Sequence, residues 1–147
     1  MTVMLSGTDA ASQIKTHFPD ALAEDNAQAV VIKSDFLLDV TDFLKHSPDL
    51  TFNFLADLTA VDFLDYFEIV YRLTSLEHNH SIILKVRCYD RQDPAVPSLT
   101  GLYRGANFFE REIYDLMGIR FTGHPNLTRI FLWEGFAGHP LRKDYIG

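Results

Sequence analysis

The chain has 147 residues, a formal charge of −7, 47% hydrophobic residues and 22% charged residues, which allows one globular domain with a sizeable core. This composition excludes a disordered chain, and the absence of any run of about 18 apolar residues excludes a membrane-spanning helix. The start of the sequence, MTVMLSGTDAA, lacks the features of a signal peptide, so we expect a soluble cytoplasmic protein. The lone cysteine excludes an internal disulfide and any multi-cysteine metal site built by this chain alone.

Charge is divided unevenly along the chain. Residues 1–70 carry a net charge of −9 and residues 71–147 a net charge of +2, while seven of the eight glycines lie after residue 90. The first half is therefore predicted to be regular and acidic, and the last third to be rich in loops. Because phosphate neutralisation supplies most nucleic-acid affinity, an acidic chain without a basic stripe is not expected to bind nucleic acid.

The sequence of the first half predicts one strand with one helix before it and one helix after it. The first helix is expected over residues 9–18, with Thr8 as its N-cap. Residues 28–33, QAVVIK, predict a short strand. Ser34 is expected to cap a helix over residues 35–46, in which apolar residues recur with a period near 3.6. Those apolar residues are Phe36, Leu37, Val40, Phe43 and Leu44.

From Thr51 onward the apolar period changes toward 2, which is typical of strands. Three runs, at residues 51–63, 66–73 and 81–89, are bounded by polar turn residues and predict an antiparallel meander. Alternation in the second run predicts one partly solvated face of the sheet. Residues 90–97, DRQDPAVP, are expected to form a loop because they contain two prolines.

A third helix is predicted over residues 107–117. Asn107 can cap its start, Glu110 has the capping-box position, and Gly118 follows where a C-cap glycine is common. Its apolar residues Phe109, Ile113, Leu116 and Met117 line one face.

The remaining residues complete the predicted fold. Residues 119–121 and 129–133 are expected to be short strands. The order of elements predicts an α+β domain over residues 1–133, with helices packed on one face of a mostly antiparallel sheet. Residues 134–147 have no periodicity and are expected to form an irregular C-terminal tail.

Two features that could carry chemistry have simpler interpretations. Cys88 lies in a predicted strand and its neighbour Arg87 points to the opposite face, so we interpret the thiol as buried and unreactive. His78 and His80 form H-N-H in a predicted hairpin loop. Because no third ligand lies nearby, we interpret them as a solvated turn rather than a metal site.

The third helix carries the charged run E-R-E-I-Y-D. Glu112 and Asp115 are neighbours on one helix face, and Glu110 lies near the helix start, where the helix dipole favours an anion. Paired carboxylates can act as acid and base, but the chain has no companion nucleophile, phosphate loop or metal set. A charged helix face, or a protein interface that includes Arg111, is therefore favoured over catalysis.

Two histidine–proline turns, His124-Pro125 and His139-Pro140, follow glycines and lie 15 residues apart. Glycine permits an unusual backbone angle and proline holds the histidine in extended geometry, so each imidazole has a fixed direction. The two histidines could form a metal pair or an acid–base pair, but rigid loops with hydrogen-bonding side chains are the favoured interpretation. The charged residues 142–144 lie in an aperiodic end that is expected to become ordered only against a partner.

The segment from Asn107 to Tyr145 resembles the signature of the respiratory complex I 30 kDa subunit family, which includes the C subunit of bacterial NADH:quinone oxidoreductase. The similar blocks are E-R-E-x-x-D, G-I-x-F-x-G-H-P, R-I and G-H-P-L-R-K-D-Y, and DLTAVD and PSLTGLY also resemble family segments. The resemblance covers residues 50–147. One departure is Thr128, where the family usually has an arginine before Arg129.

The resemblance implies a scaffold subunit of the peripheral arm that binds no flavin, iron–sulfur cluster or metal. It implies docking against the large hydrogenase-like quinone-site subunit and a small iron–sulfur subunit, on the cytoplasmic side of the membrane. Flavin and clusters, or [NiFe], are then expected in the partner subunits. The resemblance assigns the tail, residues 134–147, to partner binding. The implied partner-binding residues are Glu110, Arg111, Glu112, Asp115, His124, Pro125, Arg129, His139, Pro140, Arg142, Lys143 and Asp144.

Two alternatives stay open. The signature is shared with the homologous subunit of membrane-bound [NiFe] hydrogenases and formate hydrogenlyases, and it does not separate them from complex I. The competing class is a free-standing metal-dependent hydrolase that uses His124, His139 and the helix carboxylates. Stoichiometric zinc or iron in the purified protein would favour the hydrolase.

Overall fold

The computed structural model describes residues 3–5, 7–25, 28–132 and 137–145. Its helices are α1 (Gly7–His17), the 3-10 helix η1 (Ser34–Phe36), α2 (Leu37–His46) and α3 (Ala106–Met117). Its strands are β1 (Val3–Met4), β2 (Leu22–Asp25), β3 (Val30–Ile32), β4 (Phe54–Asp62), β5 (Phe67–Ser75), β6 (His80–Cys88), β7 (Ala95–Pro97) and β8 (Arg120–Thr122).

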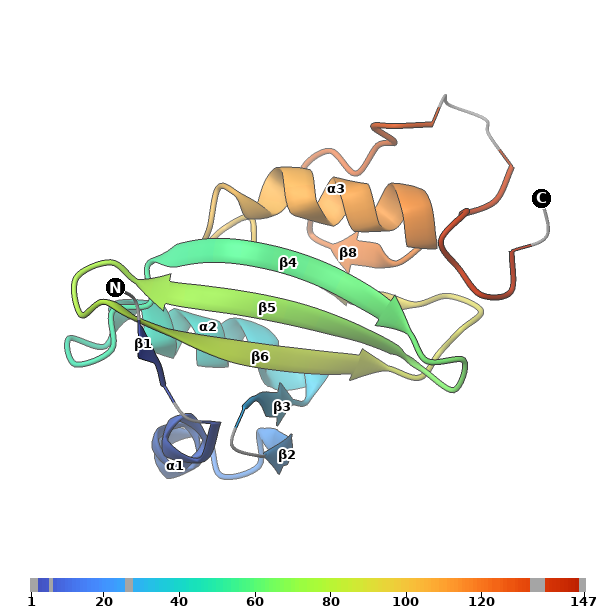
Figure 1. Ribbon diagram of the computed structural model, residues 1–147. Coiled ribbons are helices and arrows are strands. Elements are labelled where there is room, and N and C mark those ends of the chain that lie inside the picture. The colour runs from blue at the N-terminus through green and yellow to red at the C-terminus, as the bar shows by residue number, and fades with distance from the viewer. Residues whose placement is uncertain (1–2, 6, 26–27, 133–136, 146–147) are drawn as a thin grey trace.

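The main sheet has the strand order β2-β3-β6-β5-β4, with β1 paired to the start of β6 (Figure 1). The antiparallel meander β4-β5-β6 confirms the prediction from the alternating segments. β1 and β3 run parallel to β6, so the sheet is mixed but mostly antiparallel. β7 and β8 form a separate parallel pair. The predicted α+β fold is confirmed.

Apolar side chains of the meander gather on one face. On β5, Phe67, Ile69 and Tyr71 are buried, whereas Arg72 on the other face is exposed. Directly opposed residues share a face of a sheet, so the register brings buried residues of β4 and β6 beside them. Those residues are Leu55, Leu58, Ile82, Leu84 and Val86.

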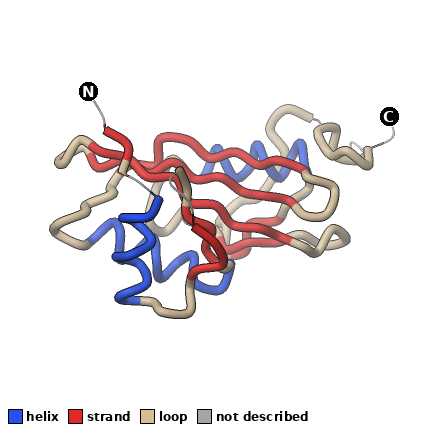
Figure 2. The backbone as a smooth tube through the Cα atoms, turned by 60° about the horizontal axis from the view of Figure 1, so that its bottom comes forward, coloured by secondary structure: helices blue, strands red, loops and turns tan. Residues whose placement is uncertain are grey.

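α2 covers this buried face, lying behind β5 and β6 in Figure 1 and below the sheet in Figure 2. Its predicted apolar stripe is confirmed, because Leu37, Val40 and Leu44 are buried and the other members are partly buried. The predicted cap is wrong. Ser34 lies inside η1, and no side-chain hydrogen bond caps α2, because the chain enters the helix through a 3-10 turn.

α3 ends as predicted and begins differently. Gly118 adopts a left-handed conformation with φ of 75°, and its N–H donates to the C=O of Tyr114. The predicted capping box is wrong, since Asn107 lies within the helix and Glu110 is buried against the preceding loop.

Other differences concern short elements. β1 and β2 were not predicted, and β7 lies in the segment predicted to be a loop. Residues 129–132 do not form the predicted strand, because residues 130–132 are bends, and its last residue, Trp133, lies outside the described residues. In the described part of the chain, no helix has the length and apolar character required to cross a bilayer.

Candidate functional site

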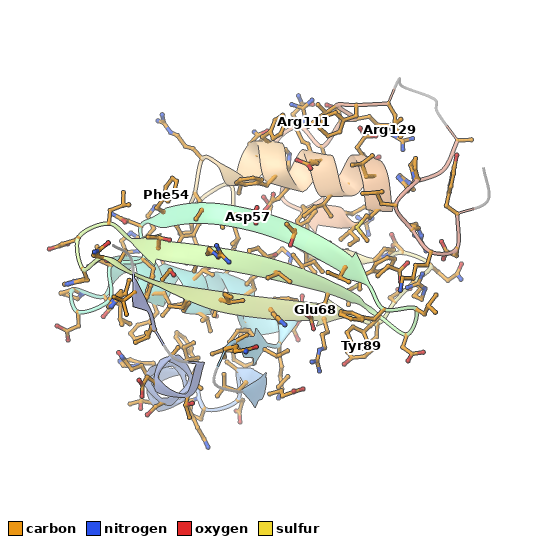
Figure 3. The ribbon with its side chains drawn as sticks, in the orientation of Figure 1. Phe54, Asp57, Glu68, Tyr89, Arg111 and Arg129 are labelled. Carbon is orange, nitrogen blue, oxygen red and sulfur yellow. The ribbon has the colours of Figure 1, made fainter. Side chains whose placement is uncertain are left out.

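The residues singled out by sequence lie on α3 and on the segments that pack around it. α3 lies alongside β4 (Figure 1), and Arg111 and Arg129 lie along the helix, away from the sheet (Figure 3). The segment after β8 and the tail residues 137–145 both return to this helix. The candidate site therefore consists of α3, the segment after β8 (residues 123–132) and the tail residues 137–145. We call this set of segments the α3 clasp.

Asp115 is the centre of the α3 clasp. Its buried carboxylate accepts a hydrogen bond from Nε of Arg129 at 2.5 Å. It also accepts hydrogen bonds from the backbone N–H groups of residues 130, 131 and 132, at 3.0, 2.6 and 3.1 Å. Burial opposes ionisation, but the Arg129 bond and the three backbone donors hold the pKa of Asp115 below its usual range. The carboxylate thus fixes the loop that follows β8.

Arg129 joins this loop to the tail. Besides the Asp115 carboxylate, its guanidinium donates to the backbone C=O of Asp115 at 2.7 Å and to the C=O of Gly138 at 2.6 Å. The ring of His139 lies beside it, with Nδ1 2.9 Å from the same Asp115 C=O. One arginine therefore connects the end of α3, the loop after β8 and the tail.

The tail is held at a second point, where β4 ends and β5 begins. Arg91 binds the buried carboxylate of Asp62 through two hydrogen bonds, at 2.7 and 2.9 Å. The backbone N–H of Lys143 donates to the same carboxylate at 2.9 Å. The Arg91 hydrogen bonds, followed by the backbone donors, hold the pKa of Asp62 well below its usual range despite burial.

The side chains of Arg142 and Asp144 complete this second anchor. Arg142 binds Asp144 at 2.8 and 2.9 Å and donates to the backbone C=O of Arg91 at 3.0 Å. Arg142 and Arg91 lower the pKa of Asp144 to about 2. Both guanidinium groups also lie over the Phe67 ring. The Cζ atom is 4.5 Å from the ring centroid for Arg91 and 5.0 Å for Arg142. Residues 137–145 therefore make contacts within their own chain that the sequence did not lead us to expect.

Glu110 is buried on the sheet side of α3. Its carboxylate accepts hydrogen bonds from Oγ of Ser98 at 2.6 Å and from the N–H of Leu99 at 2.8 Å. Burial raises its pKa to about 7, against the opposing effect of these two bonds. The carboxylates of Glu110 and Asp115 are thus both buried and hydrogen-bonded inside the chain, and their role in binding a partner stays a prediction.

Arg111 and Glu112 lie on the partly exposed side of α3. Arg111 donates to the backbone C=O of Thr128 at 3.3 Å and to its hydroxyl at 3.1 Å. Thr128, the residue that departs from the family pattern, therefore accepts bonds from an arginine instead of supplying a second guanidinium. The partner-binding role of Arg111 and Glu112 stays a prediction.

The two histidines are anchored at opposite ends of α3. Nε2 of His124 lies 3.1 Å from the C=O of Asn107, at the start of the helix, whereas His139 contacts Asp115, near its end. Eight helical residues span roughly 12 Å, so the structure does not bring the two imidazoles together. Among the residues described, no three His, Cys, Asp or Glu side chains converge closely enough to hold a metal ion.

The remaining predicted residues are more exposed. Pro125 and Lys143 are exposed, and Pro140 is partly exposed. Sequence reasoning missed Asp62, Arg91 and Phe67, although Asp62 belongs to the DLTAVD segment that resembled the family. Chemically, the α3 clasp has two parts. Buried ion pairs fix its loops, and one face of α3 remains partly exposed, which is an arrangement suited to a rigid contact surface.

Comparison with known proteins agrees with the resemblance. Residues 30–147 match the family described as respiratory-chain NADH dehydrogenase, 30 Kd subunit. The chain is 46% identical over 139 residues to the C subunit of the NADH-quinone oxidoreductase of Roseiflexus sp. (strain RS-1), covering 90% of this chain and 79% of that protein. It is also 46% identical over 137 residues to the protein of the same name from Moorella thermoacetica (strain ATCC 39073 / JCM 9320), with 90% of each covered.

A solved structure shares the fold. It is a chain from the structure of the membrane-bound sulfane sulfur reductase (MBS), an archaeal respiratory membrane complex, with a TM-score of 0.76 and 24% sequence identity. The match covers 95% of this chain and 85% of that chain. With most of its length matched by the family, and with relatives nearly half identical across nine-tenths of it, this chain belongs to the respiratory-chain NADH dehydrogenase 30 kDa subunit family.

Proposed function

We propose that this chain is a scaffold subunit of the peripheral arm of a proton-pumping NADH:quinone oxidoreductase. The single observation that carries the proposal is the high identity, over nine-tenths of the chain, to proteins named as the C subunit of NADH-quinone oxidoreductase. In this role the chain supports electron transfer to quinone by holding neighbouring subunits in place.

The geometry of the α3 clasp supports a scaffold role. Asp115, Arg129 and Asp62 use their charges to fix loops of the same chain. Buried, fully hydrogen-bonded charge networks make a surface rigid, and a rigid surface loses little conformational entropy when a partner binds. Arg111 and Glu112 remain on the partly exposed side and are the residues we propose for partner contact.

The partners we propose are the large hydrogenase-like quinone-site subunit and a small iron–sulfur subunit. We propose that the chain itself binds no flavin, iron–sulfur cluster or metal, and that those cofactors reside in other subunits. The complex would place the chain peripherally, on the cytoplasmic side of the membrane. The tail, residues 134–147, would contact partners, and within its described residues 137–145 the outer side chains would do so because the inner groups bond to this chain.

A hydrogenase-type complex is the second candidate. The solved structure of a different respiratory complex has the same fold, but the higher identities are to NADH-quinone oxidoreductase proteins, which favours the first candidate. A free-standing hydrolase is disfavoured because His124 and His139 are anchored at opposite ends of α3.

Deletion of the gene in the native host tests the proposal. Membranes of the deletion strain are expected to lose NADH-dependent quinone reduction, and a plasmid copy of the gene should restore it. Unchanged activity in the deletion strain would overturn the proposed function.

Substitution of one arginine separates assembly from folding. Arg111→Ala should change the free energy of unfolding by only about 0–1 kcal/mol, because its bonds to Thr128 are exposed. It should nevertheless reduce restoration of activity, whereas the control Arg120→Ala, which removes an exposed ion pair with Asp93, should not. Equal restoration by both variants would remove Arg111 from the contact surface.

A further inference from the structure

We propose that the edge of β4 between Leu58 and Ala60 binds an extended segment of a neighbouring subunit, in which an aliphatic side chain stands beside a lysine or arginine. The identity of that neighbour rests on the function proposed above. The site itself is built from three observations, which are an open strand edge, an apolar groove next to it and two carboxylates beside the edge, one on each face of β4.

β4 lies at the edge of the sheet. The strand order places β5 on one side of it and no strand of the described residues on the other, and in Figure 1 the side of β4 away from β5 is toward α3. A strand edge presents backbone N–H and C=O groups that can pair with another extended segment. The edge of β4 is thus a template for one more strand.

The ladder register identifies which backbone groups face outward. In an antiparallel pair, residues alternate between those that bond to the neighbouring strand and those that point away. The N–H of Phe63 donates to the C=O of Tyr66 at 3.0 Å, so Val61 and Thr59, two and four residues earlier, also bond to β5. Leu58 and Ala60 therefore direct their backbone groups away from β5.

An independent contact supports this assignment. The N–H of Leu58 donates to the side-chain Oδ1 of Asp57 at 2.9 Å, so it does not point to β5. The C=O of Leu58 and both backbone groups of Ala60 are then left at the edge. A residue placed opposite Ala60 in an added strand would form two hydrogen bonds with it.

An apolar groove receives the side chain of that added residue. Opposed residues share a face, so the side chain opposite Ala60 would point to the same side as the Ala60 methyl group, toward α3. The groove there has a volume of about 220 Å³. Small-molecule pockets measure about 300–1,000 Å³, so this groove suits a side chain rather than a quinone-sized ligand. It is lined by Leu58, Thr59, Ala60, Glu112, Ile113, Leu116, Met117 and Leu141.

The tail limits the length of the added segment. Leu141 forms one wall of the groove, and its N–H donates to the C=O of Leu116 at 2.9 Å. Two residues later, the N–H of Lys143 donates to Asp62 at the end of β4. The tail therefore covers the last part of the edge, and the open part accommodates only a short segment centred on Ala60.

Charge beside the open edge identifies the chemistry of the segment. Glu112 lines the groove and Asp57 stands at the start of the open edge, on β4 in Figure 3. Neither carboxylate forms an ion pair within the described residues. Asp57 is opposite Arg72 in the ladder, so it lies on the face of β4 away from the groove. The neighbour of an aliphatic residue in an added strand points to that face, where a lysine or arginine would pair with Asp57, while the aliphatic side chain fills the groove beside Glu112.

Hydrogen exchange of single amides in the purified complex tests the proposal without any substitution. In the isolated chain, the amide of Ala60 should exchange quickly, while the ladder-bonded amides of Thr59 and Val61 are protected. In the complex, exchange at Ala60 should slow at least 100-fold, with Thr59 and Val61 as internal references. An Ala60 amide that exchanges equally fast in both states would overturn the site.

Substitutions provide the second measurement. Ala60→Leu fills the groove, and Val61→Leu places the same leucine side chain on the opposite, exposed face of the same strand. From membranes, Ala60→Leu should recover at least tenfold less of the neighbouring subunit than wild type, while Val61→Leu recovers as much as wild type. Equal recovery by Ala60→Leu would contradict the proposal.

The outcomes also separate the site from the function on which it rests. A wild-type chain that recovers no other subunit would overturn the proposed function together with this site. A wild-type complex with a freely exchanging Ala60 amide would overturn only the site. Concentration-dependent protection of Ala60 in the isolated chain would show a second copy on this edge and would also overturn the proposal.

Discussion

The imidazole of His139 occupies the space in which a side chain at Gly118 would lie. A Cβ atom built on Gly118 would be 2.6 Å from Cδ2 of His139, closer than real Cβ contacts allow. The same glycine has a φ of 75°, which L side chains rarely adopt. The end of α3 and the docking of the tail therefore depend on one residue without a side chain.

Gly118→Ala should destabilise the protein. The left-handed conformation alone costs about 1–2 kcal/mol for an alanine, and displacement of His139 should add to that cost. Urea unfolding at neutral pH measures the change. Gly101→Ala is the control, because a Cβ at Gly101 meets nothing within 4 Å and should leave the midpoint unchanged.

A double variant separates the two contributions. If His139 causes part of the loss, Gly118→Ala should cost less in a His139→Ala background than in the wild type. An equal cost in both backgrounds would mean that the imidazole does not rest on Gly118 in solution.

Asp115→Asn tests the centre of the α3 clasp. The variant keeps the shape of the side chain but leaves Arg129 without its carboxylate, and breaking a buried pair in this way costs about 3–5 kcal/mol. Urea unfolding measures this loss. Asp93→Asn, which breaks the exposed pair with Arg120, should leave the midpoint unchanged. Similar midpoints for the two variants would show that the Asp115 network is not buried.

The pH dependence of stability should carry the signature of Glu110. Burial raises its pKa from an ordinary value of 4.5 to about 7, so the folded chain keeps a proton that the unfolded chain has already released. Stability should therefore fall as pH rises from 4.5 to 7, by up to about 3 kcal/mol. Glu110→Gln mimics the protonated acid and should lack this fall.

The difference between wild type and Glu110→Gln isolates this group from the histidines, which titrate in the same range. Asp62 and Asp115 act in a separate window. Their pKa values are lowered in the folded chain, so their stabilisation is present above the unfolded pKa and is lost in acid. Parallel stability curves for wild type and Glu110→Gln between pH 4.5 and 7 would contradict a buried, protonated Glu110.

Deletion of residues 137–147 should lower the melting temperature of the isolated chain. The deletion removes Lys143 and Arg142 from the Asp62 and Phe67 anchor and exposes the Gly118 end of α3. A loss of about 2 kcal/mol corresponds to about 4–8 °C in a chain of this size. Lys143→Ala is the control, because only its backbone N–H binds Asp62. Identical melting of the truncated and full chains would show that the tail docks only in the complex.

The sequence predicted those elements whose signal is local. The meander was found because alternation recurs within each strand, and α2 and α3 because apolar residues recur with the helical period. β1 and β2 were missed because strands of two and four residues carry too few positions for a period.

The candidate site was harder to predict because its contacts are distant in sequence. Asp62 meets Arg91 and Lys143, which lie 29 and 81 residues away, and no pattern within one segment records such pairs. Glu110 was assigned to a helix cap because carboxylates near a helix start are usually exposed. The loop carrying Ser98 and Leu99 folds over it instead.

The chain is proposed above all to be a subunit of an NADH:quinone oxidoreductase. Affinity purification of the tagged full chain from native membranes, followed by an assay of NADH-dependent quinone reduction, tests it most directly. The eluate should catalyse the reaction and contain flavin and iron–sulfur clusters in subunits other than this chain. Recovery of the chain alone, or with a nickel-containing subunit and no NADH oxidation, would contradict this function.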